Sequence, residues 1–304
     1  MGSVAVKHRV EYFALRAVAF IVRRLPRSSA LAFGRLAGRL VMKVLPGRYR
    51  LAKENMMKAL PDLSRAELEE NIRKNFEHIG ASGVEMLRLD MLKPGSDDLQ
   101  RYFVFENMHI LEDALALKRG VILLTGHLGF WEAGHFALSE LGIPFATVAK
   151  PLKNPLSEAY FAKIRTTFGT KIINSRKGAR QILKSLHENY VVGILLDQHI
   201  SPPGSIPTEF FGRQAYTTTA ITSLAMKYQI PIVPVFCQRL PDSRHKIWAE
   251  PMLILGKDGS SVAENTQRLA DIIEAAVRKD ISQWFWMHKR WRVKASHVKE
   301  KTGE

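Results

Sequence analysis

Hydrophobic and polar residues alternate along this chain with two different periods, and these periods predict its elements. Between residues 62 and 89 apolar residues recur at helical spacing, and Ser64 with Glu67 forms a capping box, so a long helix is expected there. After residue 96 short apolar runs alternate with helical stretches. Strands are predicted over 120–127, 145–149, 171–174, 190–196, 230–238 and 245–255, and helices over 132–141, 154–168, 177–188, 217–229 and 261–279.

This alternation predicts an α/β fold. We expect a mixed, mostly parallel sheet flanked by helices, preceded by N-terminal amphipathic helices. Pro231 and Pro234 indicate that the 230–238 strand lies at a sheet edge or starts irregularly. Without an internal repeat or a linker-like stretch, the simplest division is an N-terminal helical segment over 1–60, one catalytic domain over 61–295 and a loose polar tail over 296–304.

The N-terminal segments combine apolar residues with cations. The apolar stretch 10–22 is interrupted by Arg16 and closed by Arg23 and Arg24, so it lacks the roughly 20 uncharged residues of a spanning helix. It also lacks a signal-peptide cleavage site. This stretch and the segment 28–45 contain no acid after Glu11, a pattern typical of helices that lie on an anionic membrane. The alternative is that both segments pack onto the protein's own core.

The charge of the chain indicates a polyanionic partner. Among 304 residues, 45 Lys and Arg outnumber 29 Asp and Glu, for a formal charge of +16. Nucleic acid, an anionic membrane or an acidic carrier protein would fit this charge. We disfavour nucleic acid because the basic residues are dispersed and no recognition motif is present. The single cysteine, Cys237, cannot form an intramolecular disulfide, which favours a reducing compartment.

The segment 125–132 carries the clearest chemical signal. A buried strand ends there, and the chain turns through Gly126, His127 and Gly129, at the position where α/β sheets place their sites. Glu132 follows His127 by five residues, so we expect its carboxylate to reach back to one imidazole nitrogen. The other nitrogen would then take a proton from a hydroxyl group. The nucleophile would be this hydroxyl, which belongs to an acceptor substrate and not to the protein.

The segment 125–132 also permits other interpretations. A histidine five residues before a glutamate is a weak signal by itself, because such pairs are often structural. A metal site would use Glu132 and His135, with His127, Asp197 and His199 as further ligands. We disfavour it because the region is α/β rather than a four-helix bundle and offers no clear three-ligand zinc set. Rossmann, P-loop and nucleophile-elbow motifs do not occur.

Several further blocks follow in order. They are Lys150-Pro-Leu-Lys-Asn-Pro-Leu156, Ile164-Arg165 with Gly169, Leu195-Leu-Asp-Gln198, Phe210-Phe-Gly212 with Thr217-Thr-Thr219, and Trp286-Met-His-Lys-Arg-Trp291. Together with the segment 125–132, this series resembles the bacterial lipid A biosynthesis acyltransferases, which are the lauroyl and myristoyl enzymes of the lysophospholipid acyltransferase superfamily. The resemblance extends from about residue 50 to 293, and it implies a glycerolipid acyltransferase-like fold.

The resemblance also implies a reaction. A fatty acyl group would pass from acyl-acyl carrier protein to a hydroxyl of a lipid A precursor, at the cytoplasmic face of the inner membrane, without metal or nucleotide cofactor. The carrier protein, the precursor and the anionic membrane surface would be the partners. Carried over by position, the site residues are His127 as general base, Glu132 as its acidic partner, Arg165 near the oxyanion, Asp197 as a further site position, and Lys150 and Asn154 in the substrate-binding block.

Two departures and several alternatives accompany the resemblance. Glu132 stands where the wider superfamily usually has Asp, and the N-terminal segment is more charged than a typical anchor. Another glycolipid or a lysophospholipid would fit as acceptor, and a non-catalytic lipid-surface or carrier-binding protein is a different class. Phe210, Phe211 and Gly212 would line an acyl pocket or close the core. The tryptophans at 284, 286 and 291 would face a membrane interface or pack on the sheet.

Overall fold

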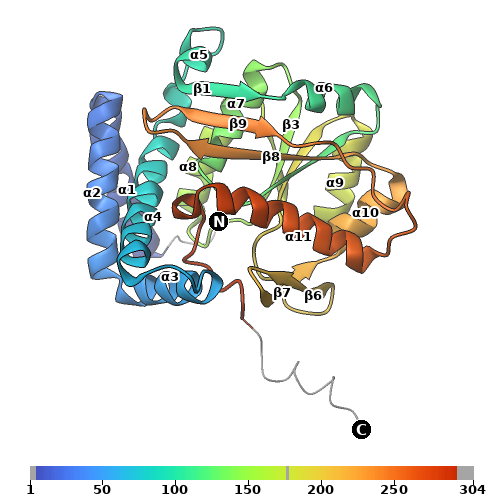
Figure 1. Ribbon diagram of the computed structural model, residues 1–304. Helices are drawn as coiled ribbons and strands as arrows, with labels where there is room; N and C mark the ends of the chain where they lie inside the picture. Colours follow the sequence, from blue (N-terminus) through green and yellow to red (C-terminus); the bar gives the residue numbers. More distant parts are fainter. Residues whose placement is uncertain (1–4, 176–177, 293–304) are drawn as a thin grey trace.

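A seven-stranded mixed sheet forms the centre of the protein (Figure 1). The computed structural model describes residues 5–175 and 178–292. The strand order is β1-β9-β8-β2-β5-β3-β4, in which β8, β2, β5, β3 and β4 are mutually parallel, β9 runs antiparallel to β8, and β1 is parallel to β9. The strands are β1 (Phe103–Glu106), β2 (Val121–Thr125), β3 (Phe145–Ala149), β4 (Lys171–Asn174), β5 (Val191–Leu195), β8 (Ile232–Arg239) and β9 (His245–Ala249). The expected α/β fold is confirmed.

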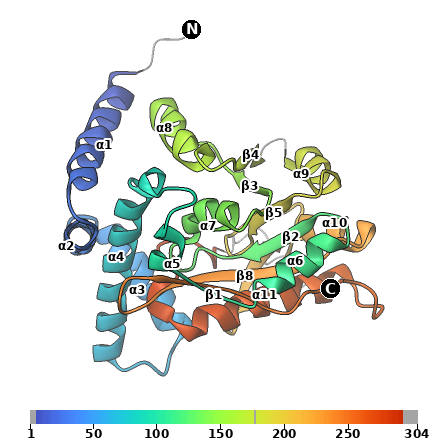
Figure 2. The same cartoon turned by 90° about the horizontal axis from the view of Figure 1, so that it is seen from above.

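Helices cover both faces of the sheet (Figure 2). One hydrophobic cluster joins the sheet to α4, α9, α10 and α11, and a second joins it to α6, α7 and α8. Their bounds are α4 (Arg65–Met86), α6 (His109–Ala116), α7 (Gly134–Glu140), α8 (Pro155–Thr166), α9 (Gly178–His187), α10 (Ala220–Tyr228) and α11 (Val262–Lys279). Short elements complete the chain: α5 (Asp98–Tyr102), η1 (Leu89–Met91), η2 (Trp131–Ala133) and η4 (Ile281–Gln283).

The two central strands are apolar because both of their faces are covered. Every residue of β2 from Val121 to Leu124 is buried, and β5 pairs with β2 in parallel from Val191 to Leu195. A strand that is covered on both faces loses the alternation of apolar and polar residues and becomes a continuous hydrophobic run. Because the last residue of β2, Thr125, pairs with the last residue of β5, Leu195, the two strands end side by side at the carboxyl end of the parallel strands.

The structure contains elements that the sequence pattern did not predict. β1, α5 and α6 occupy the stretch after residue 96, and β6 (Ser205–Phe210) pairs with β7 (Arg213–Thr218) as an antiparallel hairpin. Phe211 and Gly212 form its two-residue turn, with φ of 54° and 64°, as such tight turns require. Phe210 and Phe211 are buried in the core, so the packing alternative holds for these rings.

The structure decides between the alternatives left open for the 230–238 strand and for the tryptophans. β8 is an internal strand between β9 and β2, not an edge strand, although its start is irregular because pairing with β9 begins only at Val235, after Pro234. Trp284 and Trp286 are 1% and 0% exposed, so the interfacial alternative fails for both indoles. They pack against the rings of Phe211 and Trp291 inside the protein. The polar tail at 296–304 lies outside the described residues.

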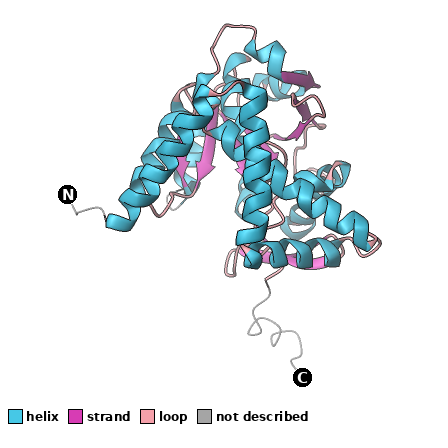
Figure 3. Cartoon of the chain, turned by 90° about the vertical axis from the view of Figure 1, so that its left-hand side faces the viewer, coloured by secondary structure: helices cyan, strands magenta, loops and turns pink. Residues whose placement is uncertain are grey.

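Three helices precede the sheet: α1 (Val6–Arg24), α2 (Arg27–Val44) and α3 (Pro46–Ala59) (Figure 3). α2 crosses α4 at close range because glycines lie at the contact. A Cβ on Gly80 would lie 2.1 Å from the carbonyl oxygen of Gly34, and a Cβ on Gly38 would lie 2.1 Å from that of Phe76. One face of α2 is therefore part of the protein's own core.

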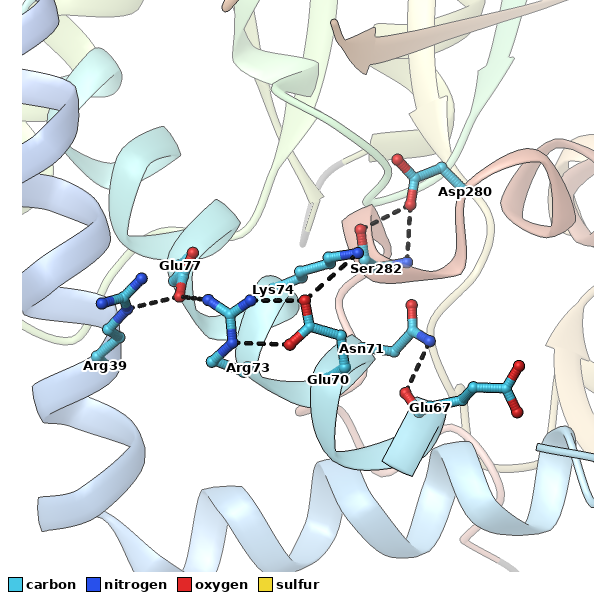
Figure 4. A network of polar contacts seen from close by, with 9 residues as sticks. All are labelled: Arg39, Glu67, Glu70, Asn71, Arg73, Lys74, Glu77, Asp280 and Ser282. Atoms are coloured by element: carbon cyan, nitrogen blue, oxygen red, sulfur yellow. Dashed lines mark hydrogen bonds and ion pairs between the residues drawn. The ribbon is translucent and has the colours of Figure 1, made fainter. Parts of the chain in front are cut away.

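Charged residues also connect α2 and α4 next to this glycine contact (Figure 4). The Arg39 guanidinium of α2 donates to Glu77 of α4 at 2.6 Å, and Arg73 bonds the same carboxylate. Arg73 also donates to Glu70 through Nε at 2.9 Å and Nη2 at 2.6 Å. Because both arginines share Glu77, this network ties α2 to α4 beside the glycine contact.

The opposite faces of α1 and α2 remain apolar and exposed. Phe13 of α1 is 68% exposed, and Leu36 and Leu40 of α2 are 64% and 59% exposed. Both of the predicted N-terminal helices are present, but neither alternative alone describes them, because each helix has one packed and one uncovered apolar side. Within the described residues, no helix combines the length and the apolar character that crossing a bilayer requires.

The glycine contact generates a test of stability. We expect Gly80→Ala to lower the free energy of unfolding by about 1–3 kcal/mol, because the new methyl group meets the α2 backbone and the helices must separate. Gly83→Ala in the same helix is the matched control: its Cβ meets nothing within 4 Å, and the free energy of unfolding should stay equal or rise by up to about 1 kcal/mol. Denaturant titration followed by circular dichroism measures both, and equal effects would contradict the packing argument.

Candidate active site

His127 and Asp197 meet at the carboxyl edge of the sheet. His127 follows β2, and Asp197 follows β5, the adjacent parallel strand. The imidazole Nδ1 lies 2.7 Å from Asp197 Oδ1, and the backbone N–H of His127 donates to Oδ2 at 2.7 Å. The side chain of Asp197 is 1% exposed and that of His127 is 21% exposed. The pair thus has a buried carboxylate and an imidazole that solvent and ligands reach.

The C-terminal segment after α11 completes the surroundings of Asp197. The indole N–H of Trp284 donates to Asp197 Oδ2 at 2.7 Å, and the N–H of Phe285 donates to the carbonyl oxygen of His127 at 3.0 Å. Burial alone would raise the pKa of Asp197, but the charge of His127 and the donated hydrogen bonds outweigh it and lower the pKa to about 2. Asp197 is therefore ionised at neutral pH.

The ionised carboxylate determines which nitrogen of the neutral imidazole carries the lone pair. Asp197 accepts the hydrogen bond from Nδ1–H, so the lone pair of the neutral ring is on Nε2. The Gln198 amide donates to this Nε2 at 3.1 Å. The edge of the Trp131 ring packs against the imidazole, with the two centroids 5.0 Å apart. The imidazole is thus contacted by Asp197, Gln198 and Trp131, and the Gln198 amide occupies the position next to Nε2.

The structure differs from the expectation that Glu132 reaches the imidazole of His127. Glu132 lies in the η2 turn and forms a bidentate pair with Arg165 of α8, through Nη2 to Oε1 at 2.6 Å and Nε to Oε2 at 2.9 Å. Its Oε2 also bonds His135 Nε2 at 3.0 Å, and His135 Nδ1 lies 3.1 Å from Thr170 Oγ1. Because the η2 turn points Glu132 toward α8, the carboxylate that contacts His127 is Asp197.

The carboxylate of Glu132 is also ionised. Burial would raise its pKa, but the hydrogen bonds from Arg165 and His135 lower it to about 2. Its side chain is 14% exposed and that of Arg165 is 19% exposed, so the pair is largely shielded from water. Glu132 and His135, the ligands of the disfavoured metal site, are thus engaged with a cation and with each other. No group of three or more ligating side chains occurs in the described residues.

The tight turn after His127 requires glycine at one position. Gly129 has φ of +61°, and a Cβ there would lie 2.0 Å from the carbonyl oxygen of Cys237 in β8. The N–H of Gly129 donates to the carbonyl oxygen of Gln283 at 3.1 Å. The turn is therefore pressed between β8 and the C-terminal segment, which fixes the position of His127.

A cavity of about 720 Å³ opens beside the pair. His127, Glu132, Arg165 and Lys150 lie on its wall. The other lining residues are mostly apolar, including Leu123, Leu138, Phe145, Ile194, Ile221 and Leu224. A volume of this size with a few polar groups suits a small-molecule or cofactor-arm ligand with a long apolar part.

Asn154, the remaining predicted site residue, is not among the residues that line the cavity. Asn154 caps α8, since its Oδ1 accepts from the N–H of Leu156 at 3.1 Å. Its amide donates to the carbonyl oxygen of His8 at 2.9 Å and to Glu11 at 3.0 Å, which ties α1 to α8. Asn154 is therefore engaged in structural contacts. Of the two predicted substrate-binding residues Lys150 and Asn154, Lys150 lines the cavity.

Sequence reasoning missed the pairing of His127 with Asp197 and the contacts of Gln198 and Trp284. One signal was available: the Leu195–Gln198 block follows a buried strand, as the segment around His127 does. Polar residues at the ends of adjacent parallel strands meet at one edge. The sequence did not reveal that β5 and β2 are neighbours.

A basic imidazole oriented by a buried carboxylate, beside an apolar cavity, is the arrangement of an enzyme that activates a hydroxyl nucleophile. The family model for bacterial lipid A biosynthesis acyltransferases matches residues 2–293. The chain belongs to this family, and it is an O-acyltransferase of the lipid A biosynthesis type.

Individual relatives have low sequence identity to this chain, but the similarity extends over most of its length. The chain is 25% identical to lipid A biosynthesis acyltransferase 2 of Shigella flexneri, over 87% of this chain and 82% of that protein. It is 22% identical to a lipid A biosynthesis acyltransferase of Haemophilus influenzae, over 78% and 73%. The lipid A biosynthesis myristoyltransferase of Escherichia coli K12 is 24% identical, over 67% and 61%. The crystal structure of the 1-acyl-sn-glycerophosphate acyltransferase PlsC from Thermotoga maritima matches 84% of this chain and 99% of that chain, with 12% identity and a TM-score of 0.39.

The ionisation of Glu132 generates a pH prediction. Its pKa falls from 4.5 in the unfolded chain to about 2 in the folded protein, so the stability it contributes is complete above pH 4.5 and disappears as the pH falls toward 2. We expect Glu132→Gln to lower the free energy of unfolding by about 2–3 kcal/mol at pH 7 and by much less near pH 2.5. The exposed Glu112→Gln is the control and should change little at either pH. Denaturant titrations across this range would refute the assignment if the Glu132 effect did not vary with pH.

Proposed function

We propose that this acyltransferase moves a fatty acyl group from acyl-acyl carrier protein to a hydroxyl of a lipid A precursor, with His127 as general base. The observation that carries the proposal is the His127–Asp197 pair at the mouth of an apolar cavity. The hydrogen bond between His127 and Asp197 supports Asp197, rather than Glu132, as the orienting residue. No cofactor is required, because a thioester is already activated for attack by an alcohol.

The proposed step begins with displacement of the Gln198 amide from Nε2 by the acceptor hydroxyl. Nε2 takes the hydroxyl proton while the oxygen attacks the thioester carbonyl carbon, and Asp197 stabilises the imidazolium that forms. The tetrahedral intermediate then expels the carrier thiolate. The C–S bond breaks, the ester C–O bond remains, and the imidazolium returns its proton to the thiolate. General-base assistance of this kind contributes roughly 10²–10⁴-fold.

Arg165 supplies positive charge to the same cavity. Its bidentate pair with Glu132 uses Nε and Nη2 and fixes the plane of the guanidinium, which leaves Nη1 for a ligand. An oxyanion that develops on the thioester carbonyl would be stabilised by such a fixed donor. Glu132 is then a positioning residue for Arg165, and His135 supports Glu132 from its other side. The two carboxylates thus have separate tasks.

The apolar part of the cavity would hold the acyl chain. Leu138, Phe145 and Ile221 are among the residues that line it, and His127 lies on the same wall. An acyl chain in this cavity would bring its thioester carbon next to the imidazole, so binding energy from the chain would orient the reacting group.

The proposed activity is tested with purified protein, acyl-acyl carrier protein and a lipid A precursor that lacks the transferred chain. With EDTA present, the wild type should turn over. We expect His127→Ala and Asp197→Asn to lower kcat by about 10³–10⁴-fold, because the base is lost or left in the wrong tautomer. Glu132→Gln should lower kcat less and leave the pH dependence of kcat/KM unchanged, since it acts through Arg165.

The exposed His109→Ala is the control for this series and should behave as the wild type. Turnover that persists in His127→Ala would refute the general-base assignment. Turnover with a lysophospholipid or another glycolipid, and none with the lipid A precursor, would refute the proposed acceptor while keeping the chemistry.

We also propose that α1 and α2 lie on the cytoplasmic face of the inner membrane. Residues 6–59 carry 13 Lys or Arg and two Asp or Glu, which favours an anionic surface. The exposed Leu36 and Leu40 flank a groove that Arg39, Lys43 and Arg73 also line, so apolar and cationic groups share one side. Apolar side chains would enter the acyl layer while the cations remain at the headgroups.

Vesicle sedimentation tests this attachment. We expect the full chain to bind vesicles that contain phosphatidylglycerol, and the Leu36→Asp/Leu40→Asp variant to lose at least about 10-fold in affinity, because it lacks two apolar side chains and adds two negative charges that oppose insertion. The matched control, Leu117→Asp/Tyr228→Asp, alters exposed residues at the C-terminal ends of α6 and α10 and should bind normally. Equal binding by both variants would refute the assignment of this surface.

A further inference from the structure

A second cavity, of about 410 Å³, lies at the same edge of the sheet as His127. Phe130 lines this cavity, whereas the neighbouring Trp131 lines the larger one together with His127. Its other walls come from α2, α4, η1, α5 and the first residues of β1 and β9. The turn after His127 therefore separates two cavities, and the proposed reaction uses only one of them.

The walls of the second cavity carry four cations, Arg27, Arg88, Lys93 and Arg101. Arg88 donates to the carbonyl oxygen of Leu25 at 2.9 Å, and Arg101 lies over the Tyr102 ring at 5.9 Å, so neither cation is committed to a carboxylate by these contacts. The acids Asp97 and Asp98 also lie on the wall, and Asp98 accepts from the backbone N–H of Lys93 at 2.9 Å.

The carboxylate of Glu85 on the cavity wall is paired with more than one cation. Glu85 is 7% exposed and is shared by Arg27 at 2.8 Å, Arg239 at 2.6 Å and His245 at 3.0 Å. Two guanidinium groups thus face one carboxylate in a buried setting, where an unmatched charge is costly. An anion in the cavity would supply the missing negative charge.

His245 also lines this wall. It is 2% exposed, and its Nε2 bonds Glu85. Its Nδ1 is buried without a hydrogen-bond partner in the part of the chain that the structure describes. Through its Nε2, His245 takes up the same Glu85 oxygen that Arg27 contacts, so the imidazole and both guanidinium groups depend on one carboxylate.

The cavity also has an apolar side that free phosphate would not need. Leu31, Leu89, Phe103 and Phe130 line it and are all buried. It lies beside the corner between α1 and α2, where Arg23 donates to the carbonyl oxygen of Leu87 at 3.0 Å and the side chain of Phe20 is 57% exposed. Cationic and apolar groups together match a lipid whose headgroup carries a phosphate.

We infer that this second cavity binds the phosphate-bearing headgroup of a lipid, with the phosphate against Arg27, Arg88 and Arg101 and the first part of its chain against Leu31 and Leu89. The lipid is either the phosphorylated acceptor or a phospholipid of the bilayer, and both present the same chemistry. The inference rests on the proposed function only for the acceptor as source, because a bilayer phospholipid would bind whether or not transfer occurs.

Calorimetric titration of the full chain with dihexanoyl phosphatidic acid tests the site, with inorganic phosphate as the comparison probe. We expect the wild type to bind the lipid at least about 10-fold more tightly than phosphate, and Lys93→Glu/Arg101→Glu to lose about 10-fold or more in lipid affinity. The matched control Lys227→Glu/Lys257→Glu makes the same change of charge elsewhere and should bind normally. Equal affinity for lipid and phosphate, or an unaffected Lys93→Glu/Arg101→Glu variant, would overturn the inference.

Steady-state kinetics then identify the source of the lipid. If the acceptor's phosphate occupies the cavity, Lys93→Glu/Arg101→Glu raises the acceptor KM about 10-fold or more at unchanged kcat, and the effect disappears with a dephosphorylated acceptor. If a bilayer phospholipid occupies it, the acceptor KM is unchanged and phosphatidic acid binding is lost. His127→Ala should lose turnover but keep phosphatidic acid binding, which separates failure of the proposed function from failure of this site.

Discussion

The buried carboxylate of Asp197 is the interaction on which the site depends. An ion with a 1% exposed side chain is tolerated only if its oxygens are fully engaged. The partners come from distant parts of the chain: the imidazole and backbone N–H of His127, and the indole N–H of Trp284. Because losing any partner would leave a buried charge unmatched, the ends of β2 and β5 and the C-terminal segment are held in one geometry.

A buried cation supports the same region from the other side. Arg290 is 1% exposed, and its Nη1 donates to the carbonyl oxygens of Gln198 at 3.1 Å and Tyr216 at 2.9 Å. Burial lowers its pKa to about 10, so it still carries a charge at neutral pH, and the charge of Asp197 opposes this shift. Arg290 therefore both anchors the Gln198 backbone and contributes positive potential near the ionised pair.

The N-terminal helices are joined to the site through buried amides. Asn75 of α4 donates to the carbonyl oxygens of Ser282 at 2.8 Å and Trp284 at 2.6 Å, and Asn55 of α3 donates to that of Trp286 at 2.9 Å. The segment that carries Trp284 is thus fixed by the same helical layer that packs against α2. The helical layer of α2, α3 and α4 and the segment that donates to Asp197 are consequently joined by direct hydrogen bonds.

The sequence by itself determined the local structure and the chemical class of the site. The capping box at Ser64 fixed the start of α4, and the continuous apolar run before His127 fixed a buried strand whose end carries polar residues. It did not determine that Asp197 rather than Glu132 orients the imidazole, nor did it reveal the β6–β7 hairpin or the internal place of β8. Caps and periodicity depend on residues within a few positions of one another, and they are visible in the sequence. The partner of a buried charge depends on which strands become neighbours and on the direction in which a short turn points Glu132, and only packing of the whole chain decides both.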